Sequence, residues 1–193
     1  PQPPLEMEAR VEGALRRRAS RISPDRINRA LRTITPVLAE HGGVGIIGAL
    51  IGTDSIELLP ADPSPPPAPF TGSDTAWTMP LPEVAPGAPV DYEQLAALPA
   101  LSTVGTTGDG RIAMINLEQV GALHIGGDEQ RAGQLINHLI IELSQSLWTD
   151  GMHLHVADKA EGMRPLDTDR IQTVEDLAFE AKVLAVHAKA IRE

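Results

Sequence analysis

The chain lacks cysteine entirely, and it has few aromatic residues. The absence of cysteine excludes disulfide bonds, thiolate metal sites and cysteine nucleophiles. Aromatic residues make up only 3% of the 193 residues, so the core must be built from aliphatic side chains. Apolar residues still make up 42%. This is enough to bury a core in one α/β domain, or in a small domain with an appendage.

Long apolar runs are also missing, since no run of about 18 apolar residues occurs and none predicts a membrane span. The chain opens on Pro-Gln-Pro-Pro without methionine or a signal sequence. We therefore expect it to be a piece of a longer protein, with any membrane anchor outside this piece.

Lysine is rare, and the positive charge is unevenly distributed. The net charge is −10, but residues 1–32 hold eight arginines and four acidic residues, so they carry +4 and the remainder −14. An arginine-rich arm from Arg10 to Arg32 would suit nucleic acid or anionic lipid. We favour an arginine-rich helix face that docks on the acidic body of the same chain, because acids interleave these arginines.

The first 60 residues predict two helices and a β-hairpin. Residues 5–22 predict an amphipathic helix, and Ser23-Pro24 predicts the start of a second one that Pro36 should kink or restart. Two β-branched runs at 44–51 and 55–59 predict an antiparallel hairpin. The apolar stripe of the first helix consists of Met7, Val11, Ala14, Leu15 and Ile22, with Arg10, Arg17 and Arg21 on another face.

Three parts follow from this pattern: residues 1–60 as a helix pair and hairpin, 61–90 as a proline-rich connector, and 91–193 as an α/β domain. The connector includes a short strand candidate around Trp77. In the last part, residues 91–98 predict a short helix with Leu95 and Leu98 inward. Segments 101–104 and 111–117 predict a further hairpin.

The region from 111 to 158 predicts the core of the fold. Residues 122–125 form a wholly apolar run, expected as a buried central strand. Asp128 is expected to cap the helix that follows, and residues 152–157 predict a strand parallel to 122–125. The fold class is therefore α/β, a mixed sheet with a strand–loop–helix–strand core like that of P-loop NTPases. The buried face of the helix is expected to hold Ala132, Leu135, Ile136, Leu139, Leu143 and Leu147.

Gly126 and Gly127 stand where a phosphate-binding loop would begin. A working loop, G-x-x-x-x-G-K-[ST], needs a second glycine, a lysine and a hydroxyl at positions that Arg131, Ala132 and Gly133 occupy here. Losing the cation and the Mg²⁺ ligand removes the main electrostatic contributions to phosphoryl transfer, so we expect no enzyme and no cofactor. Weak anion binding by Gly126, Gly127 and Arg131 stays open, although Asp128 and Glu129 oppose it.

The histidines offer a weak metal candidate. His153 and His155 have the spacing of one strand face, and His124 or His138 is a conceivable third ligand. No third ligand stands at a fixed spacing, so ordinary half-buried histidines are the favoured interpretation. The sequence also contains no G-x-S-x-G nucleophile elbow.

Several short motifs carry a family resemblance. They are N-L-E-x-x-G at 116–121, G-D-x-x-R-A at 127–132, S-x-W-x-D at 146–150 and D-x-x-R-I-x-x-V-E-D-L at 167–177. With the order of elements in the front half, they resemble the middle region of actinobacterial membrane proteins that combine LysM modules with a bacterial transcriptional activator domain. More distantly, the core is similar to FtsK-like translocases and type VII secretion ATPases.

The resemblance implies a non-catalytic, ATPase-derived module on the cytoplasmic side of a membrane-tethered transcriptional regulator. Its partners would be other proteins, neighbouring domains of the same chain, or a second copy. The alternative is a nucleotide- or anion-sensing domain that binds without hydrolysis. A third hypothesis is contact with DNA or anionic lipid through the arginines from Arg10 to Arg32.

Overall fold

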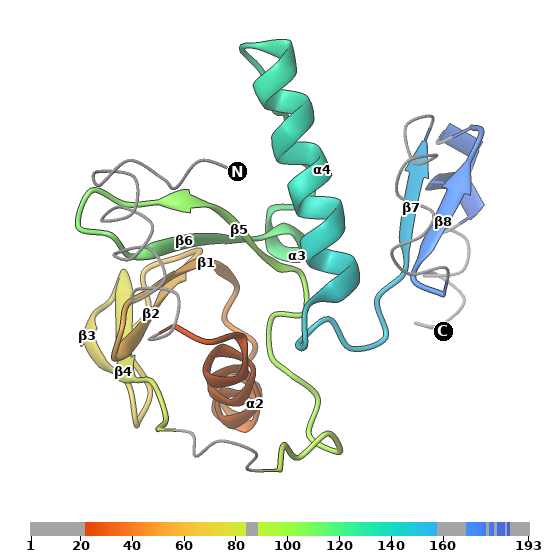
Figure 1. Ribbon diagram of the computed structural model, residues 1–193. Coiled ribbons are helices and arrows are strands. Elements are labelled where there is room, and N and C mark those ends of the chain that lie inside the picture. Colours follow the sequence, from red (N-terminus) through yellow and green to blue (C-terminus); the bar gives the residue numbers. More distant parts are fainter. Residues whose placement is uncertain are drawn as a thin grey trace, which may run out of the picture.

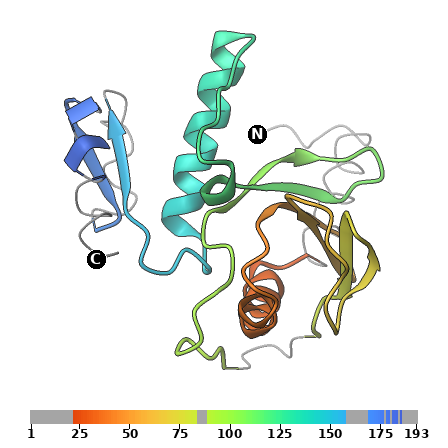
Figure 2. The ribbon, with the colours of Figure 1, turned by 180° about the vertical axis from the view of Figure 1, so that it is seen from behind.

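A six-stranded antiparallel sheet with one helix packed against it forms the body of the protein (Figure 1). The computed structural model describes residues 22–83, 89–157 and 169–185, apart from 177, 180 and 184. A second long helix projects from the edge of this body, and a two-stranded parallel sheet lies beyond it (Figures 1 and 2). The protein is thus a mixed α/β structure. The first predicted helix, 5–22, lies outside the described residues except for its last one.

The main sheet has the strand order β3-β4-β2-β1-β6-β5, and every neighbouring pair is antiparallel. Both predicted hairpins are confirmed, as β1–β2 and β5–β6. The sheet takes strands from all three expected parts of the chain, so it does not divide at residues 60 and 90. The strands are β1 Ile46–Ile51, β2 Ser55–Pro60, β3 Thr71–Ser73, β4 Ala76–Pro80, β5 Leu101–Thr106 and β6 Ile112–Asn116.

The helix α2, Pro24–Glu40, begins and ends where the sequence predicts. The Ser23 hydroxyl accepts the N–H of Arg26 at 3.3 Å, and proline occupies the first turn, where a missing N–H costs nothing. The helix continues through Pro36 without the predicted restart. It ends at His41, and Gly42 follows with φ of 80°.

The core lies between α2 and one face of the sheet. Alternate residues of β2 and β4 point into it, as expected for a half-buried antiparallel sheet. Trp77 is fully buried at its centre, and its indole N–H donates to the Ser64 carbonyl at 2.7 Å. The fully buried aliphatic side chains of the core are Ala30, Leu31, Ile34, Ile46, Ala49, Ile51, Ile56, Leu58 and Leu101.

The predicted strand at 122–125 is wrong. After β6 come the single-turn helix α3, Leu117–Val120, and then an unpaired, mostly exposed loop from residue 121 to 128. Because β6 already pairs with β1 on one side and β5 on the other, residues 122–125 cannot pair with β6, and they do not extend the sheet at its outer strands β5 and β3 either. A P-loop-like core is therefore not confirmed.

The helix α4, Glu129–Gln145, starts at the predicted cap, Asp128. Beyond it, β7 Leu154–Ala157 pairs in parallel with β8 Ile171–Val174. The strand predicted at 152–157 is thus present, but it does not pair with 122–125. Residues 178, 179, 181–183 and 185 are helical, and the Asp176 carboxylate accepts the N–H groups of residues 178 and 179.

The helix predicted at 91–98 is also wrong, because tertiary hydrogen bonds replace the helical ones. The Gln94 carbonyl accepts from Arg32, and the Ala96 N–H donates to Asp150. Leu95, expected to face inward, is 63% exposed, and Leu98 has a φ of 58°. These residues form an irregular strap between α2 and the turn that follows α4.

Candidate functional site

The strap, α2 and the turn after α4 meet at a buried ion pair. Arg32 is 4% exposed, and its guanidinium lies 3.0 Å from the Asp150 carboxylate. The same guanidinium donates to the Asn28 side chain and to the carbonyls of Gln94 and Leu147. A fork of N–H donors suits such a set of acceptors. Arg32 therefore fixes the base of α4 against the body of the protein.

The helix α4 carries one apolar stripe, and only part of that stripe is covered. Leu139 and Leu143, near the C-terminal end, are 6% and 7% exposed. One turn closer to the N-terminus, Ile136 is 45% exposed and Leu135 is half-buried. Figures 1 and 2 show the reason: the N-terminal half of α4 extends beyond the sheet that covers the C-terminal half. The predicted buried face is therefore buried at one end only.

The loop from residue 121 to 128 adds a second exposed apolar segment. Figure 2 shows it running from α3 along α4 to the start of that helix. Leu123 in this loop is 42% exposed. We call the exposed part of the α4 stripe and this leucine the distal surface, comprising Leu123, Ala132, Leu135 and Ile136.

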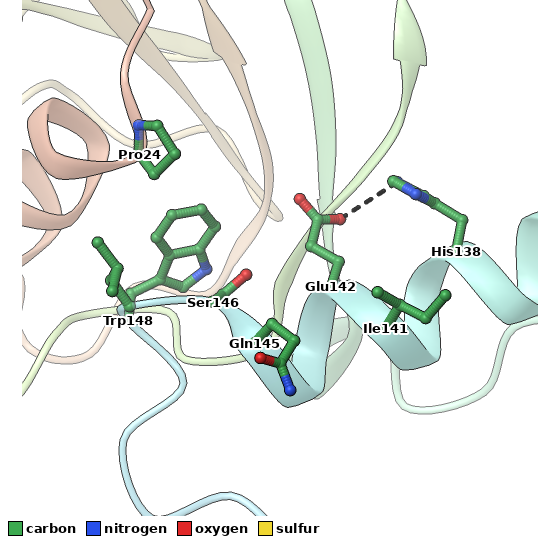
Figure 3. A pocket seen from close by; sticks show the side chains of 8 residues that line it. Pro24, His138, Ile141, Glu142, Gln145, Ser146 and Trp148 are labelled. Atoms are coloured by element: carbon green, nitrogen blue, oxygen red, sulfur yellow. Dashed lines mark ion pairs between the residues drawn. The ribbon is translucent and has the colours of Figure 1, made fainter. Parts of the chain in front are cut away.

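A cleft of about 270 Å³ lies at the other end of α4 (Figure 3). Pro24 and Trp148 stand on one side, and His138, Ile141 and Glu142 on the other. Ile141 is 40% exposed and Leu147, which also lines the cleft, is 39% exposed. The Trp148 ring is buried, and its N–H donates to the Leu101 carbonyl at 3.0 Å.

The polar side chains of the cleft make hydrogen bonds and ion pairs within the protein. Both carboxylate oxygens of Glu142 accept from Thr103, from its N–H at 2.6 Å and from its hydroxyl at 2.7 Å. His138 lies one turn earlier, with its Nε2 3.5 Å from Glu142 (dashed in Figure 3). Glu142 thus ties α4 to β5 and leaves a negative charge at the cleft. Glu142 is not predicted as a functional residue from the sequence, although a single acid within the apolar run LIIELSQ was a usable signal.

The glycine turn does not show the geometry of a phosphate site. Gly127 has a φ of 111°, which a glycine adopts readily. The Asp128 carboxylate accepts the Arg131 N–H at 2.9 Å, so an acid already occupies the start of α4. The positive end of the helix dipole is therefore partly neutralised there. Anion binding by Gly126, Gly127 and Arg131 stays a prediction that this carboxylate opposes.

The histidine pair is not joined by a third ligand in the described part of the chain. Among those residues, no three His, Asp or Glu side chains gather closely enough to hold a metal ion. His153 is exposed and precedes β7, while His155 lies within it and is half-buried. Neither His124 nor His138 completes a set with them.

Two of the arginines between Arg10 and Arg32 bind within the protein. Arg26 donates to the carbonyls of Thr53, Leu81 and Pro82, and Arg32 holds Asp150. The arginines from Arg10 to Arg21 lie outside the described residues. For Arg26 and Arg32, docking on the chain's own body is the observed role.

In the part of the chain that the structure describes, no helix combines the length and the apolar character needed to cross a lipid bilayer. A scan against protein-family models and searches of curated proteins and of solved structures found no match to this chain.

Proposed function

We propose that this chain is a non-catalytic interaction module of a larger, membrane-tethered regulator, and that another protein docks on its distal surface. The observation that carries the proposal is the partial burial of one apolar stripe. Leu139 and Leu143 are buried by the body of the protein, whereas Ile136 on the same stripe is 45% exposed. A contiguous exposed apolar stripe marks an interaction surface more often than isolated exposed side chains do.

The chemistry of the distal surface favours a protein partner. Its apolar side chains are spaced for helix-on-helix packing, with Ala132 small enough for close approach. The charges at the start of α4, on Asp128, Glu129 and Arg131, sum to −1, and the chain as a whole carries −10. Both features disfavour nucleic acid and phosphate ligands. A helix or an apolar patch of a neighbouring domain is the partner that this surface fits.

The degenerate phosphate loop supports the non-catalytic part of the proposal. The positions of the lysine and the hydroxyl hold Ala132 and Gly133. Without these groups, neither the phosphate charge nor a Mg²⁺ ion has its usual ligand. The proposal of an ATPase-derived origin rests on the sequence resemblance alone, and the interaction surface does not depend on it.

The test uses photo-crosslinking in the cells that contain the full-length protein. A photoreactive residue replaces Ile136 in one variant and Gln134, on the opposite side of α4, in the other. Crosslinks at position 136 are expected to identify the partner. The purified partner is then titrated against the wild-type chain, Ile136→Asp and Gln134→Asp.

Ile136→Asp is expected to weaken binding about 10- to 100-fold, which corresponds to an interface residue worth roughly 1–3 kcal/mol. Gln134→Asp should bind like the wild type. Equal loss of affinity in both variants, or equal crosslinking at both positions, would contradict the proposal. A clear rise in melting temperature with ATP, GTP or a cyclic dinucleotide would instead support the sensing alternative.

A further inference from the structure

The cleft at the C-terminal end of α4 joins an apolar wall to a carboxylate (Figure 3). The rings of Trp148 and Pro24 stand on one side, and Glu142 stands on the other. The Trp148 N–H already donates to the Leu101 carbonyl at 3.0 Å. The indole therefore offers a ligand only the apolar surface of its ring, and the carboxylate of Glu142 provides the charge.

The charge of Glu142 is not balanced by a lysine or an arginine. Both of its oxygens accept from neutral groups of Thr103, at 2.6 and 2.7 Å. In the described part of the chain, its ion-pair partner is His138 alone, whose Nε2 lies 3.5 Å away and is charged only when protonated. The Glu142 side chain is 16% exposed, so water screens its charge poorly. Because a carboxylate can accept about four hydrogen bonds, Glu142 has room for a further donor.

The size and the rim of the cleft indicate what kind of ligand it fits. Its volume is about 270 Å³. Pockets for small molecules typically measure about 300–1,000 Å³, so this space suits a single side chain better than a larger molecule. Ile141 and Leu147 beside it are 40% and 39% exposed. A free small cation would leave this apolar rim in water, whereas a protein that carries the cation would cover it.

Arginine is the basic side chain that such a cleft favours. Its guanidinium is more weakly hydrated than the ammonium of lysine, so it is brought beside apolar surface at a lower cost. Its N–H donors form short, charge-assisted hydrogen bonds with a carboxylate. Arginine is also enriched at the centres of protein interfaces. The net charge of −10 attracts a basic partner surface as well.

We propose that the cleft binds an arginine side chain of a protein partner. Its guanidinium donates to the Glu142 carboxylate, and its aliphatic stem lies against Trp148 and Ile141. The partner residues on either side of this arginine cover Leu147 and the rest of the rim. The cleft lies on the opposite half of α4 from the distal surface, so the proposal does not rest on the proposed function, and either can fail alone.

Peptide titration followed by NMR tests the proposal in the full chain. The chain has two tryptophans, so the indole N–H signal of Trp148 reports on the cleft and that of the fully buried Trp77 reports on the core. The probe is a pentapeptide with arginine at its centre and leucine at both ends. A matched control peptide carries citrulline, a neutral isostere of arginine, at the same place. N-acetylargininamide represents the free cation.

The arginine peptide is expected to shift the Trp148 signal saturably and to leave the Trp77 signal in place. The citrulline peptide should bind about tenfold more weakly, because the charge on the donor is lost. The absence of a saturable shift, or equal affinities of the two peptides, would overturn the proposal. N-acetylargininamide that binds as tightly as the peptide would overturn it as well, and would assign the cleft to free small cations.

Variants of the protein test the role of the carboxylate. Glu142→Gln keeps the shape of the side chain and an acceptor for Thr103 but removes the charge, so the arginine peptide should bind about tenfold more weakly. Glu129→Gln removes the same charge from the exposed first turn of α4 and should bind like the wild type. Equal affinities of Glu142→Gln and the wild type would contradict the proposal.

A second pair of variants covers the case in which Glu142→Gln disturbs the fold. His138→Arg places a permanent guanidinium one turn before Glu142, at a side chain that is 51% exposed, so it should compete with the peptide and weaken its binding several-fold. Asn137→Arg adds the same charge on another, exposed face of α4 and should weaken binding less. Circular dichroism of each variant shows whether the fold is intact. Equal affinities of these two variants would show that Glu142 does not hold the arginine.

Discussion

Replacing Arg32 by alanine is expected to destabilise the protein strongly, because one side chain connects three separate segments. Its guanidinium lies 3.0 Å from Asp150 and donates to the carbonyls of Gln94 and Leu147. The side chains of Arg32 and Asp150 are 5% and 24% exposed, so the pair is largely removed from water.

The size of the effect follows from what the substitution leaves behind. Removing one partner of a buried pair costs about 3–5 kcal/mol, since the other charge stays buried without its partner. Asp150 keeps some contact with water and still accepts the Ala96 N–H at 2.9 Å, which lowers the cost. We therefore expect a loss of about 3 kcal/mol in the free energy of unfolding.

Urea denaturation followed by circular dichroism measures this loss. Arg131→Ala removes an exposed arginine from α4 and should change the free energy of unfolding by less than about 0.5 kcal/mol. Arg32→Lys keeps the positive charge but loses the forked N–H donors of the guanidinium. Its free energy of unfolding should therefore lie between those of the wild type and Arg32→Ala. A loss below about 1 kcal/mol for Arg32→Ala would place the pair among ordinary surface salt bridges and refute the reasoning.

Three further predictions concern the core, the cleft and the β5–β6 turn. Trp77→Ala empties a fully buried site and should cost about 3–5 kcal/mol in the same urea assay, whereas a loss near 1 kcal/mol would contradict tight packing there. Glu142→Ala leaves both donors of Thr103 without their acceptor, so a loss of about 1–3 kcal/mol is expected; an unchanged urea midpoint would mean that water replaces the carboxylate. The hydrogen bond from the Thr107 hydroxyl makes the largest contribution to lowering the pKa of Asp109 below its ordinary value of 3.8. A carboxyl whose pKa is lower in the folded protein stabilises the fold at pH values above its ordinary pKa. This stabilisation is lost as the pH falls through the pKa of the folded state. Thr107→Ala should therefore raise the pKa of Asp109 in an NMR titration of its carboxyl carbon, and an unchanged midpoint would show that the hydroxyl is not the cause.

Much of the local structure could be predicted, because its signals lie within a few residues of one another. Ser23 and Asp128 mark the starts of α2 and α4 through hydrogen bonds to the first turn, a purely local interaction. The glycines after His41 end α2 for a similarly local reason. The two hairpins were also visible, since alternating β-branched residues flank short glycine-containing turns.

The candidate site was predicted less well, because exposure depends on what lies opposite a side chain. Periodicity placed Ile136 and Leu139 on one stripe of α4, and both were expected to be buried. Leu139 is buried, whereas Ile136 is 45% exposed, because the N-terminal half of α4 extends beyond the sheet (Figure 1). Nothing within the helix marks that limit. The cleft was likewise invisible, since it joins Pro24 to residues more than a hundred positions later in the chain.

The sequence by itself determined that the core is mostly aliphatic and has no disulfides, and it marked where the capped helices start. It also showed that the glycine turn lacks the lysine and hydroxyl of a phosphate loop. These properties follow from composition and from interactions between near neighbours. Only the tertiary structure showed that residues 122–125 form no strand, because this depends on which segments pair: β6 takes β1 and β5 as its neighbours. The tertiary structure also explains the glycine at position 48 within β1, because an added Cβ would lie 2.5 Å from the Met114 carbonyl oxygen of the neighbouring strand. Such constraints arise between segments distant in the chain, and no local pattern records them.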